Sequence, residues 1–172
     1  MGFQVINQFE TVFLPLVPQL PKGLIHNDGN DHNIVLDDHE DVIGIIDLGD
    51  MTVSPYVVEL AVTITYGTPC TPPCMAHSSR HVAALLDKVD PIGLSREMIA
   101  GYAAVKPLGA TEQALVHLLV CARLSQSVTM GAYSYAMNPA NTYLLVTAQP
   151  GWSLLERLIA MSTDDVARFN GL

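Results

Sequence analysis

The most informative part of the sequence is HNDGNDHNIVLDDHEDVIGIIDLGD, which spans residues 26–50. Positions 26–33 are polar residues and glycine without periodicity, which predicts a loop. Two runs rich in β-branched residues follow, at 34–36 and 42–46, on either side of a polar turn at 37–41. We therefore predict a loop followed by a β-hairpin with two buried strands.

The predicted hairpin brings the residues at its two ends together. Asn33 directly precedes the first strand, and Asp47 directly follows the second. Opposed residues of an antiparallel pair lie about 4.5–5.5 Å apart at Cα. An amide oxygen and a carboxylate then converge, and oxygen ligands of this kind suit Mg²⁺. We predict that Asn33 and Asp47 hold this ion.

Asp28 lies five residues before Asn33 on the same loop. A carboxylate there is close enough to project toward the predicted ion and free to act as a base toward a substrate hydroxyl. We expect His26 to brace the loop from behind.

Acidic residues are concentrated in this region. Eight of the 17 acids fall between positions 26 and 50, and no Lys or Arg occurs from 23 to 79. We interpret the acids of the turn, Asp37, Asp38, Glu40 and Asp41, as solvated surface. For Asp28, Asp47 and Asp50 we expect a cation rather than a salt bridge to balance the charge.

The whole chain has 172 residues, 49% of them apolar, and a formal charge of −9. Its length fits a single domain with a sizeable core, and its composition excludes a disordered or coiled-coil chain. The acidic balance disfavours nucleic acid and anionic lipid as partners. The longest apolar stretch, 56–67, contains Glu59 and is shorter than the roughly 20 residues of a membrane span. An odd count of three cysteines without a signal peptide indicates reduced thiols and a cytoplasmic location.

The rest of the chain has mainly helical patterns. Apolar spacing predicts an amphipathic N-terminal helix that ends at Pro15 and Pro18. A second helix is expected to begin at Ser54 and Pro55 and to stop at Gly67. Further helices are predicted at 81–89, 95–105, 111–137 and 151–161. Apolar residues surround much of 115–136, so we expect that helix to be central and buried on most faces.

The loop and hairpin together follow the pattern His-x-Asp-x4-Asn, then two strands, then Asp-x-Gly, at His26, Asp28, Asn33 and Asp47-Leu48-Gly49. This combination is the catalytic-loop and metal-loop signature of protein-kinase-like phosphotransferases. The alternative is a pair of polar loops at the hairpin ends without a catalytic role. Four segments, at 26–34, 44–51, 119–127 and 146–152, make the chain resemble the hydroxylysine kinase family of aminoglycoside-phosphotransferase-like kinases.

This resemblance runs over nearly the whole chain and implies a mainly α fold with a small β-hairpin, the C-terminal lobe of a protein-kinase-like enzyme. In that lobe, residues 26–33 are the catalytic loop, 34–46 the hairpin, 47–50 the metal loop and 54–168 the helical remainder. The implied activity is transfer of the GTP γ-phosphate to the 5-hydroxyl of 5-hydroxylysine in lysine catabolism. The resemblance makes Asp28 the base, with Asn33 and Asp47 as Mg²⁺ ligands on the nucleotide phosphates.

Four other residues have two possible roles. Asp50 can assist a second metal ion or accept hydrogen bonds near the start of the helix at Pro55. Glu59 and Arg123 lie inside apolar helices, where a buried charge usually has a partner. They can pair with each other, or one of them can read the ammonium or carboxylate of an amino acid. Gln126, one turn after Arg123, can join either arrangement.

The sequence departs from the family at several positions. Asn27 stands where the family has Gly, although Asn tolerates a positive φ angle. Gly29 replaces an apolar residue and Leu48 replaces a Phe, so we expect looser packing behind the loop. Only 25 residues precede His26, without a glycine-rich turn or a strand lysine. We therefore expect no nucleotide lobe in this chain, little activity by the chain alone, and self-association through the exposed lobe interface. The alternative is a non-catalytic isoform or regulatory relic of the lobe.

The remaining cysteines and histidines offer weaker signals. A zinc site is conceivable at 70–81, where two cysteines and two histidines lie within twelve residues, but the spacing is compressed. We favour a variable surface loop there. We expect Cys121 in the core, His117 hydrogen-bonded within a helix, His32 hydrogen-bonded within its loop, and His39 at a turn tip.

Overall fold

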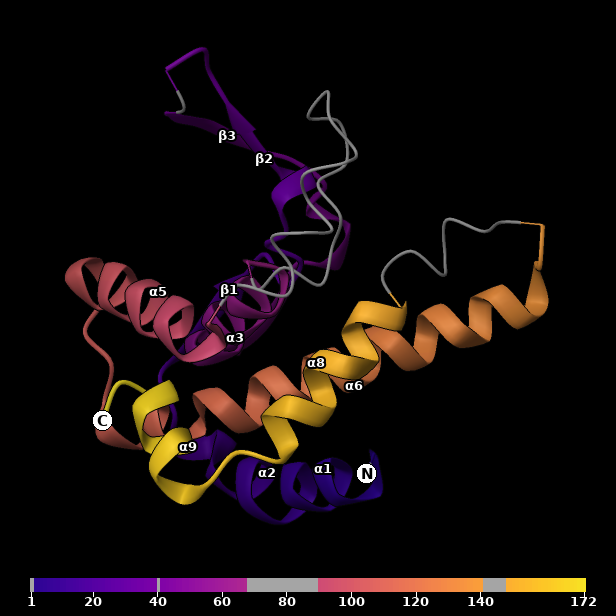
Figure 1. Cartoon of the computed structure of the whole chain (residues 1–172). Helices are drawn as coiled ribbons and strands as arrows, with labels where there is room; N and C mark the ends of the chain where they lie inside the picture. The colour runs from indigo at the N-terminus through magenta and orange to yellow at the C-terminus, as the bar shows by residue number, and fades with distance from the viewer. Residues whose placement is uncertain (1, 40, 68–89, 141–147) are drawn as a thin grey trace.

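The computed structural model describes residues 2–39, 41–67, 90–140 and 148–172 (Figure 1). In these ranges the chain is mainly helical with small antiparallel strand pairs, which confirms the mainly α part of the predicted fold class. The described β structure forms two separate antiparallel pairs: β1 (Lys22–Ile25) with β4 (Thr52–Pro55), and β2 (Ile34–Leu36) with β3 (Val42–Ile45). The predicted helix at 81–89 lies outside the described residues.

The N-terminal helix forms as predicted but passes through Pro15. It consists of α1 (Gly2–Gln8), a π-helical turn at Phe9–Phe13, α2 (Leu14–Leu16) and a final 3₁₀ turn at Val17–Gln19. Proline cannot donate the backbone hydrogen bond that the helix requires, and its ring crowds the preceding turn. The wider π-turn ends at Phe13, two residues before Pro15, and such a local distortion accommodates a proline.

The β1–β4 pair was not predicted. Leu24 pairs with Val53, and Gly23 with Ser54. Ser54 and Pro55 therefore belong to a strand. Our prediction that they begin the next helix, which rested on their capping chemistry, is wrong. Helix α3 begins one residue later and spans Tyr56–Gly67, and the Tyr56 N–H donates to the Pro21 carbonyl at 3.1 Å. The strand pair closes the loop region at its base.

The predicted hairpin is formed by β2 and β3, with Ile34 opposite Ile45. Its strands are not buried, which corrects our expectation. Val42, Ile43 and Ile45 are 63%, 64% and 58% exposed. The hairpin projects away from the helices (Figure 1), and no described element packs on it, because a two-stranded ribbon has no second layer of its own.

The core lies between α3 and the long helix α6 (Ala110–Met137), which also packs against α8 (Ala148–Ile159). Val57, Ile64, Val116 and Leu155 are completely buried there. The predicted central position of α6 is confirmed for 115–128, whereas 129–137 is largely exposed and Tyr133 is 61% exposed. Figure 1 shows why: the C-terminal end of α6 extends beyond the neighbouring helices.

Among the described helices, α6 is long and apolar enough to cross a membrane by length and composition. In its most apolar window 39% of the residues are buried inside the protein, and α6 packs against α3 and α8. A core helix passes the same test, so this property alone indicates little.

Two shorter helices complete the described fold. Helix α5 (Pro91–Val105) begins four residues earlier than we predicted, because the Asp90 side chain accepts from the N–H groups of Ile92 and Gly93 at 3.0 and 3.1 Å. Helix α9 (Thr163–Phe169) was missed, although Ser162 caps it by accepting from Asp165 N–H at 3.1 Å. Ser followed three residues later by an acid is a readable start signal.

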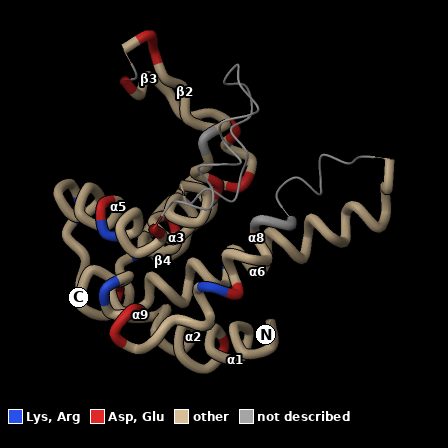
Figure 2. Tube along the Cα trace, in the orientation of Figure 1, with Lys and Arg blue, Asp and Glu red and all other residues tan. Residues whose placement is uncertain are grey.

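Most of the acids of residues 26–50 that the structure describes lie on the hairpin and on the loop before it (Figure 2). One of them has a basic partner that the local sequence does not contain. Arg123, on α6, lies 3.0 Å from Asp28. The expectation that no salt bridge balances Asp28 is therefore wrong, because the cation comes from 95 positions further along the chain.

Candidate active site

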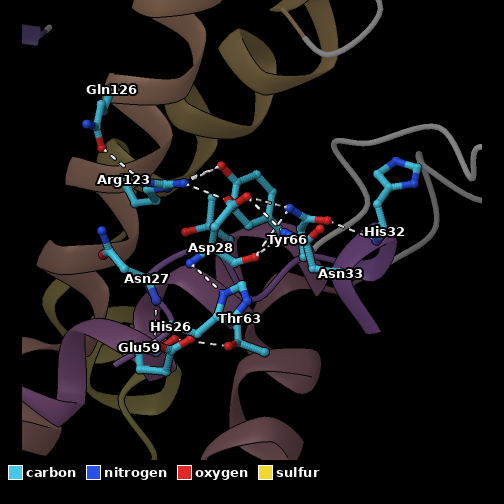
Figure 3. A network of polar contacts seen from close by, with 12 residues as sticks. His26, Asn27, Asp28, His32, Asn33, Glu59, Thr63, Tyr66, Arg123 and Gln126 are labelled. Atoms are coloured by element: carbon cyan, nitrogen blue, oxygen red, sulfur yellow. Dashed lines mark hydrogen bonds and ion pairs between the residues drawn. The ribbon is translucent and has the colours of Figure 1, made fainter. Parts of the chain in front are cut away.

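Asp28 is the centre of the polar network in Figure 3. Its Oδ1 accepts from Arg123 Nη2 at 3.0 Å. Its Oδ2 accepts from the amide nitrogens of Asn30 and Asn33, each at 3.0 Å. The side chain is 23% exposed, so the carboxylate is oriented by fixed donors and still open to a ligand. A general base needs both properties.

The Arg123 side chain that contacts Asp28 is itself held by hydrogen bonds to two other residues. Its Nε and Nη2 both donate to the Tyr66 hydroxyl, at 3.2 and 2.8 Å, and its Nη1 donates to Gln126 Oε1 at 3.3 Å. The guanidinium carbon lies 5.2 Å from the centroid of the Tyr66 ring. The Arg123 side chain is 17% exposed. The ion pair is therefore largely withdrawn from water, where charges interact more strongly than on an open surface.

His26 ties the loop to the end of the hairpin. Its Nε2 donates to the Ile46 carbonyl at 2.8 Å, and its Nδ1 accepts from the Asp28 N–H at 3.3 Å. Both contacts are satisfied when the ring carries its proton on Nε2, because a carbonyl oxygen only accepts. His26 therefore lies where we expected it to support the loop. Its contact with the base is to the Asp28 backbone N–H and not to the carboxylate.

Asn27 has a left-handed backbone, with φ at +65°. Asn adopts this conformation more readily than most residues, as its occupancy of a glycine position suggested. Its N–H donates to Glu59 Oε2 at 2.8 Å. Glu59 and Arg123 therefore hold two successive loop residues, Asn27 and Asp28, and do not pair with each other. Of the two alternatives that we considered for these charges, pairing with each other is therefore wrong, because the loop passes between them.

One face of α3 carries the residues that approach the loop. Glu59, Thr63 and Tyr66 are spaced at i, i+4 and i+7, which places them on the same side of a helix. We singled out Glu59 but missed Thr63 and Tyr66. The spacing from Glu59 was a readable signal for both, whereas nothing in the local sequence pointed to Asn30.

Gly29 allows a close approach between the loop and α3. A Cβ placed there would lie 2.9 Å from Thr63 Oγ1 and 3.0 Å from Glu59 Oε1. We expected looser packing behind the loop because Gly29 replaces an apolar residue. The structure has the opposite arrangement, since the missing side chain lets two polar atoms of α3 occupy its place.

Asn33 is buried at the entrance to the hairpin, with 6% exposure. Its amide nitrogen donates to Asp28 Oδ2 at 3.0 Å and to the Asp28 carbonyl at 2.9 Å. Within the described chain both side-chain hydrogen bonds use this nitrogen, so the amide oxygen remains for a cation. The Ile46 N–H donates to the Asn33 carbonyl at 3.0 Å, which holds the two hairpin ends side by side as predicted.

Asp47 follows Ile46 directly and has a left-handed backbone, with φ at +58°. Its side chain is exposed, and no described residue hydrogen-bonds to its carboxylate. A strained conformation at a non-glycine residue is typical of a functional position. The hairpin thus presents a carboxylate beside the residue that bonds Asn33.

The oxygen of Asn33 and the carboxylate of Asp47 fit Mg²⁺ as a donor set. Mg²⁺ is usually bound by one or two protein oxygens, with water and substrate phosphates completing the shell. No cluster of three or more His, Cys, Asp or Glu side chains suited to a metal occurs among the described residues. This pair therefore suits an ion that arrives with phosphates.

Asp50 lies in the short 3₁₀ turn Leu48–Asp50 and is exposed. Strand β4 separates it from α3, and the first N–H of that helix bonds the Pro21 carbonyl instead. Of the two roles that we considered for Asp50, accepting hydrogen bonds near the helix start is not found in the described part of the chain.

The remaining histidine and cysteine predictions fall on different parts of the chain. Cys121 is buried, and burial raises the pKa of its thiol to about 12. Burial lowers the pKa of His117, whose Nε2 lies 3.1 Å from the Leu158 carbonyl. Cys121 belongs to the core, as expected, and His117 is a partly buried residue of α6 whose ring has a hydrogen-bond partner, as expected. The candidate zinc ligands lie outside the described residues: Cys70, Cys74, His77 and His81.

Comparison with known proteins agrees with this geometry. The family described as "Phosphotransferase enzyme family" (APH) matches residues 3–92. The chain is 34% identical over 167 residues to the hydroxylysine kinase of Mus musculus, which covers 92% of this chain and 40% of that protein. It is 33% identical to the hydroxylysine kinase of Xenopus laevis over 95% of this chain and 42% of that protein.

The hydroxylysine kinase of Danio rerio is 27% identical over 95% of this chain and 43% of that protein. The chain thus spans about two fifths of the length of the curated relatives that it matches. The family match covers the N-terminal helix, the loop with Asp28, the hairpin and α3. On this match and these relatives, the chain belongs to the phosphotransferase enzyme family.

Proposed function

We propose that this protein transfers the γ-phosphate of GTP to the 5-hydroxyl of 5-hydroxylysine, with Asp28 as the base. The observation that carries the proposal is the Asp28 carboxylate, which three side-chain donors orient at the entrance of a hairpin whose ends carry Asn33 and Asp47. Membership of the phosphotransferase family and the similarity to hydroxylysine kinases support the reaction class and the substrate.

The proposed roles follow from the chemistry of each group. Phosphoryl transfer depends mostly on positioning and on stabilising the charge of the transferred group. Asp28 would accept the proton of the attacking hydroxyl. Asn33 and Asp47 would hold Mg²⁺ on the nucleotide phosphates, where the ion supplies positive charge. His26 would keep the loop against the hairpin, through its bonds to Ile46 and Asp28.

We also propose that these 172 residues correspond to the C-terminal lobe of the family and transfer phosphate slowly by themselves. The share of the relatives' length that they span, 40–43%, agrees with one part of such a protein, and the catalytic-loop and metal-loop pattern at 26–50 supports the C-terminal lobe as that part. The exposed apolar side chains of the hairpin strands support the proposal that this surface packs against another lobe of such a protein or against a second copy of this chain. A cytoplasmic location stays a prediction from the cysteine content.

Radiolabelled phosphate transfer tests this function. The purified protein, in excess over [γ-³²P]GTP with Mg²⁺ and 5-hydroxylysine, is expected to give slow transfer that Asp28→Asn removes. Lysine, which lacks the hydroxyl, is the matched substrate control, and ATP in place of GTP tests the donor. The proposal would be contradicted if neither GTP nor ATP gave any transfer, or if Asp28→Asn transferred phosphate as fast as the unchanged protein.

Calorimetry tests the metal ligands separately. We expect Mg²⁺·GTP to bind the unchanged protein more tightly than it binds Asp47→Asn. Asp41→Asn, on the exposed turn of the same hairpin, is the control for the loss of one charge. Equal affinity for all three proteins would exclude Asp47 from the metal site.

A further inference from the structure

Arg123 holds the base from a part of the chain far from the catalytic loop. It lies on α6 and contacts Asp28 Oδ1 across a separation of 95 residues. Neither side chain is more than about a quarter exposed, at 17% for Arg123 and 23% for Asp28. The guanidinium and the carboxylate each lose hydration at this partly buried position, so additional hydrogen bonds are needed to hold them there.

That support comes from two neighbours of the guanidinium. Tyr66, on α3, accepts from both Nε and Nη2, and Gln126, one turn further along α6, accepts from Nη1. Figure 3 shows Arg123 between Gln126 on one side and Asp28 with Tyr66 on the other. The contact with α3 fixes the direction of the guanidinium before any ligand binds.

The hydrogen bonds of Asp28 distinguish its two oxygens. Each oxygen of a carboxylate has about two acceptor positions. Oδ2 accepts from two amide nitrogens, those of Asn30 and Asn33, and is saturated. Within the described chain Oδ1 accepts from Arg123 alone. The open position of the base is therefore on Oδ1, directly beside the guanidinium.

We propose that Arg123 is a positioning residue, which holds Asp28 so that Oδ1 receives the proton of the substrate hydroxyl. This inference rests on the proposed function. In the step, the hydroxyl oxygen forms a bond to the γ-phosphorus and the bond from that phosphorus to the nucleoside diphosphate breaks. The hydroxyl proton passes to Oδ1. Without Arg123, the carboxylate is held through Oδ2 alone and can turn about that oxygen.

Single-turnover transfer from GTP to 5-hydroxylysine by the full chain tests this role. Arg123→Gln should lower the maximal transfer rate by about tenfold to a hundredfold, which is less than the loss of the base itself, about 10²–10⁴-fold, because Asp28 is still present. The half-saturating hydroxylysine concentration should stay within about twofold, because a positioning residue does not touch the substrate. Arg123→Lys should recover part of the rate, since an ammonium can donate to Oδ1 but cannot form the fork with Tyr66.

Arg157→Gln is the matched control, because Arg157 is exposed on α8; its rate should equal that of the unchanged protein. If Arg123→Gln fails to fold by circular dichroism, Tyr66→Phe carries the test. That variant keeps the ion pair and removes the supporting oxygen, and a several-fold lower rate with an unchanged half-saturating concentration is expected.

The outcomes separate the two proposals. A raised half-saturating concentration with an unchanged rate overturns the positioning role and assigns Arg123 to substrate binding. An unchanged rate in the folded variant also overturns it, while the proposed function stands. No transfer by the unchanged protein overturns the proposed function, and the role of Arg123 in it falls as well.

Discussion

The catalytic loop and the hairpin that follows it are adjacent in sequence and differ in how they are held. Asp28 receives hydrogen bonds from its own loop and from α6, and Asn27 is bonded by α3. The hairpin has no described helix against it, and Ile43 is 64% exposed. The base is therefore fixed by the core of the protein, whereas Asp47 sits at the end of a ribbon with little support.

This difference suits the proposed reaction. A base must keep its orientation throughout the proton transfer, because small displacements cost large factors in rate. A carboxylate that binds a metal ion with incoming phosphates gains its final geometry from the ligand. The contrast predicts that substitutions in the loop have large effects and that substitutions on the hairpin strands have small ones.

Asp28→Asn should have the largest effect. Loss of the base is expected to lower single-turnover transfer from GTP by about a hundredfold or more. The carboxamide keeps the shape of the side chain and can still accept from Arg123, so the circular dichroism spectrum should be unchanged. A folded Asp28→Asn protein with full activity would place the base elsewhere.

Gly29→Ala should be the most destabilising substitution behind the loop. The new Cβ would lie 2.9 Å from Thr63 Oγ1 and 3.0 Å from Glu59 Oε1, and overpacking of this kind costs about 1–3 kcal/mol. Urea unfolding measures the change. Gly101→Ala, on α5, is the control, because no atom lies within 4 Å of its Cβ and alanine stabilises a helix by about 0.5–1 kcal/mol. Equal effects of the two substitutions would contradict the close approach of α3.

Glu59→Ala should weaken the loop by a smaller amount. It leaves the Asn27 N–H without its acceptor at 2.8 Å, and because this donor is only partly buried, we expect a cost of about 1 kcal/mol, the low end of the range for an unsatisfied donor. Glu59→Gln keeps an acceptor oxygen and should retain most of the free energy of unfolding. If Gln were as destabilising as Ala, the charge of Glu59 would matter more than this hydrogen bond.

Ile43→Thr should have the smallest effect on stability. An exposed strand residue that packs on no described element is expected to change the free energy of unfolding by at most about 0.5 kcal/mol. The same substitution should reduce any self-association of the chain, since it lowers the apolar exposure of the hairpin. Sedimentation velocity measures that second effect, and a cost above about 2 kcal/mol would indicate that Ile43 is buried.

Local sequence patterns were sufficient for the hairpin, for most of the described helices and for part of the site. The β-branched runs around 37–41 predicted the hairpin, and the ends of that hairpin brought Asn33 next to Ile46, the neighbour of Asp47. Spacing predicted α6 within one residue at its start. These successes share a physical cause, because turn chemistry, hydrophobic period and ladder geometry act over a few residues.

Several other predictions failed where a distant segment decided the outcome. Apolar strand residues indicated burial, but nothing described covers Val42 and Ile43. Ser54 and Pro55 have the chemistry of a helix start, yet pairing with β1 makes them a strand. A polar loop offered no signal that Gly29 lies against α3.

The sequence by itself determined which groups are available: a carboxylate, an amide and a second carboxylate at the loop and at the two ends of a hairpin. Only the tertiary structure decided their partners. Glu59 and Arg123 could pair with each other or with other groups on sequence grounds, since both are charges in apolar helices. The fold placed the loop between α3 and α6, so each charge found a nearer partner, and ion pairs and hydrogen bonds form only at short range.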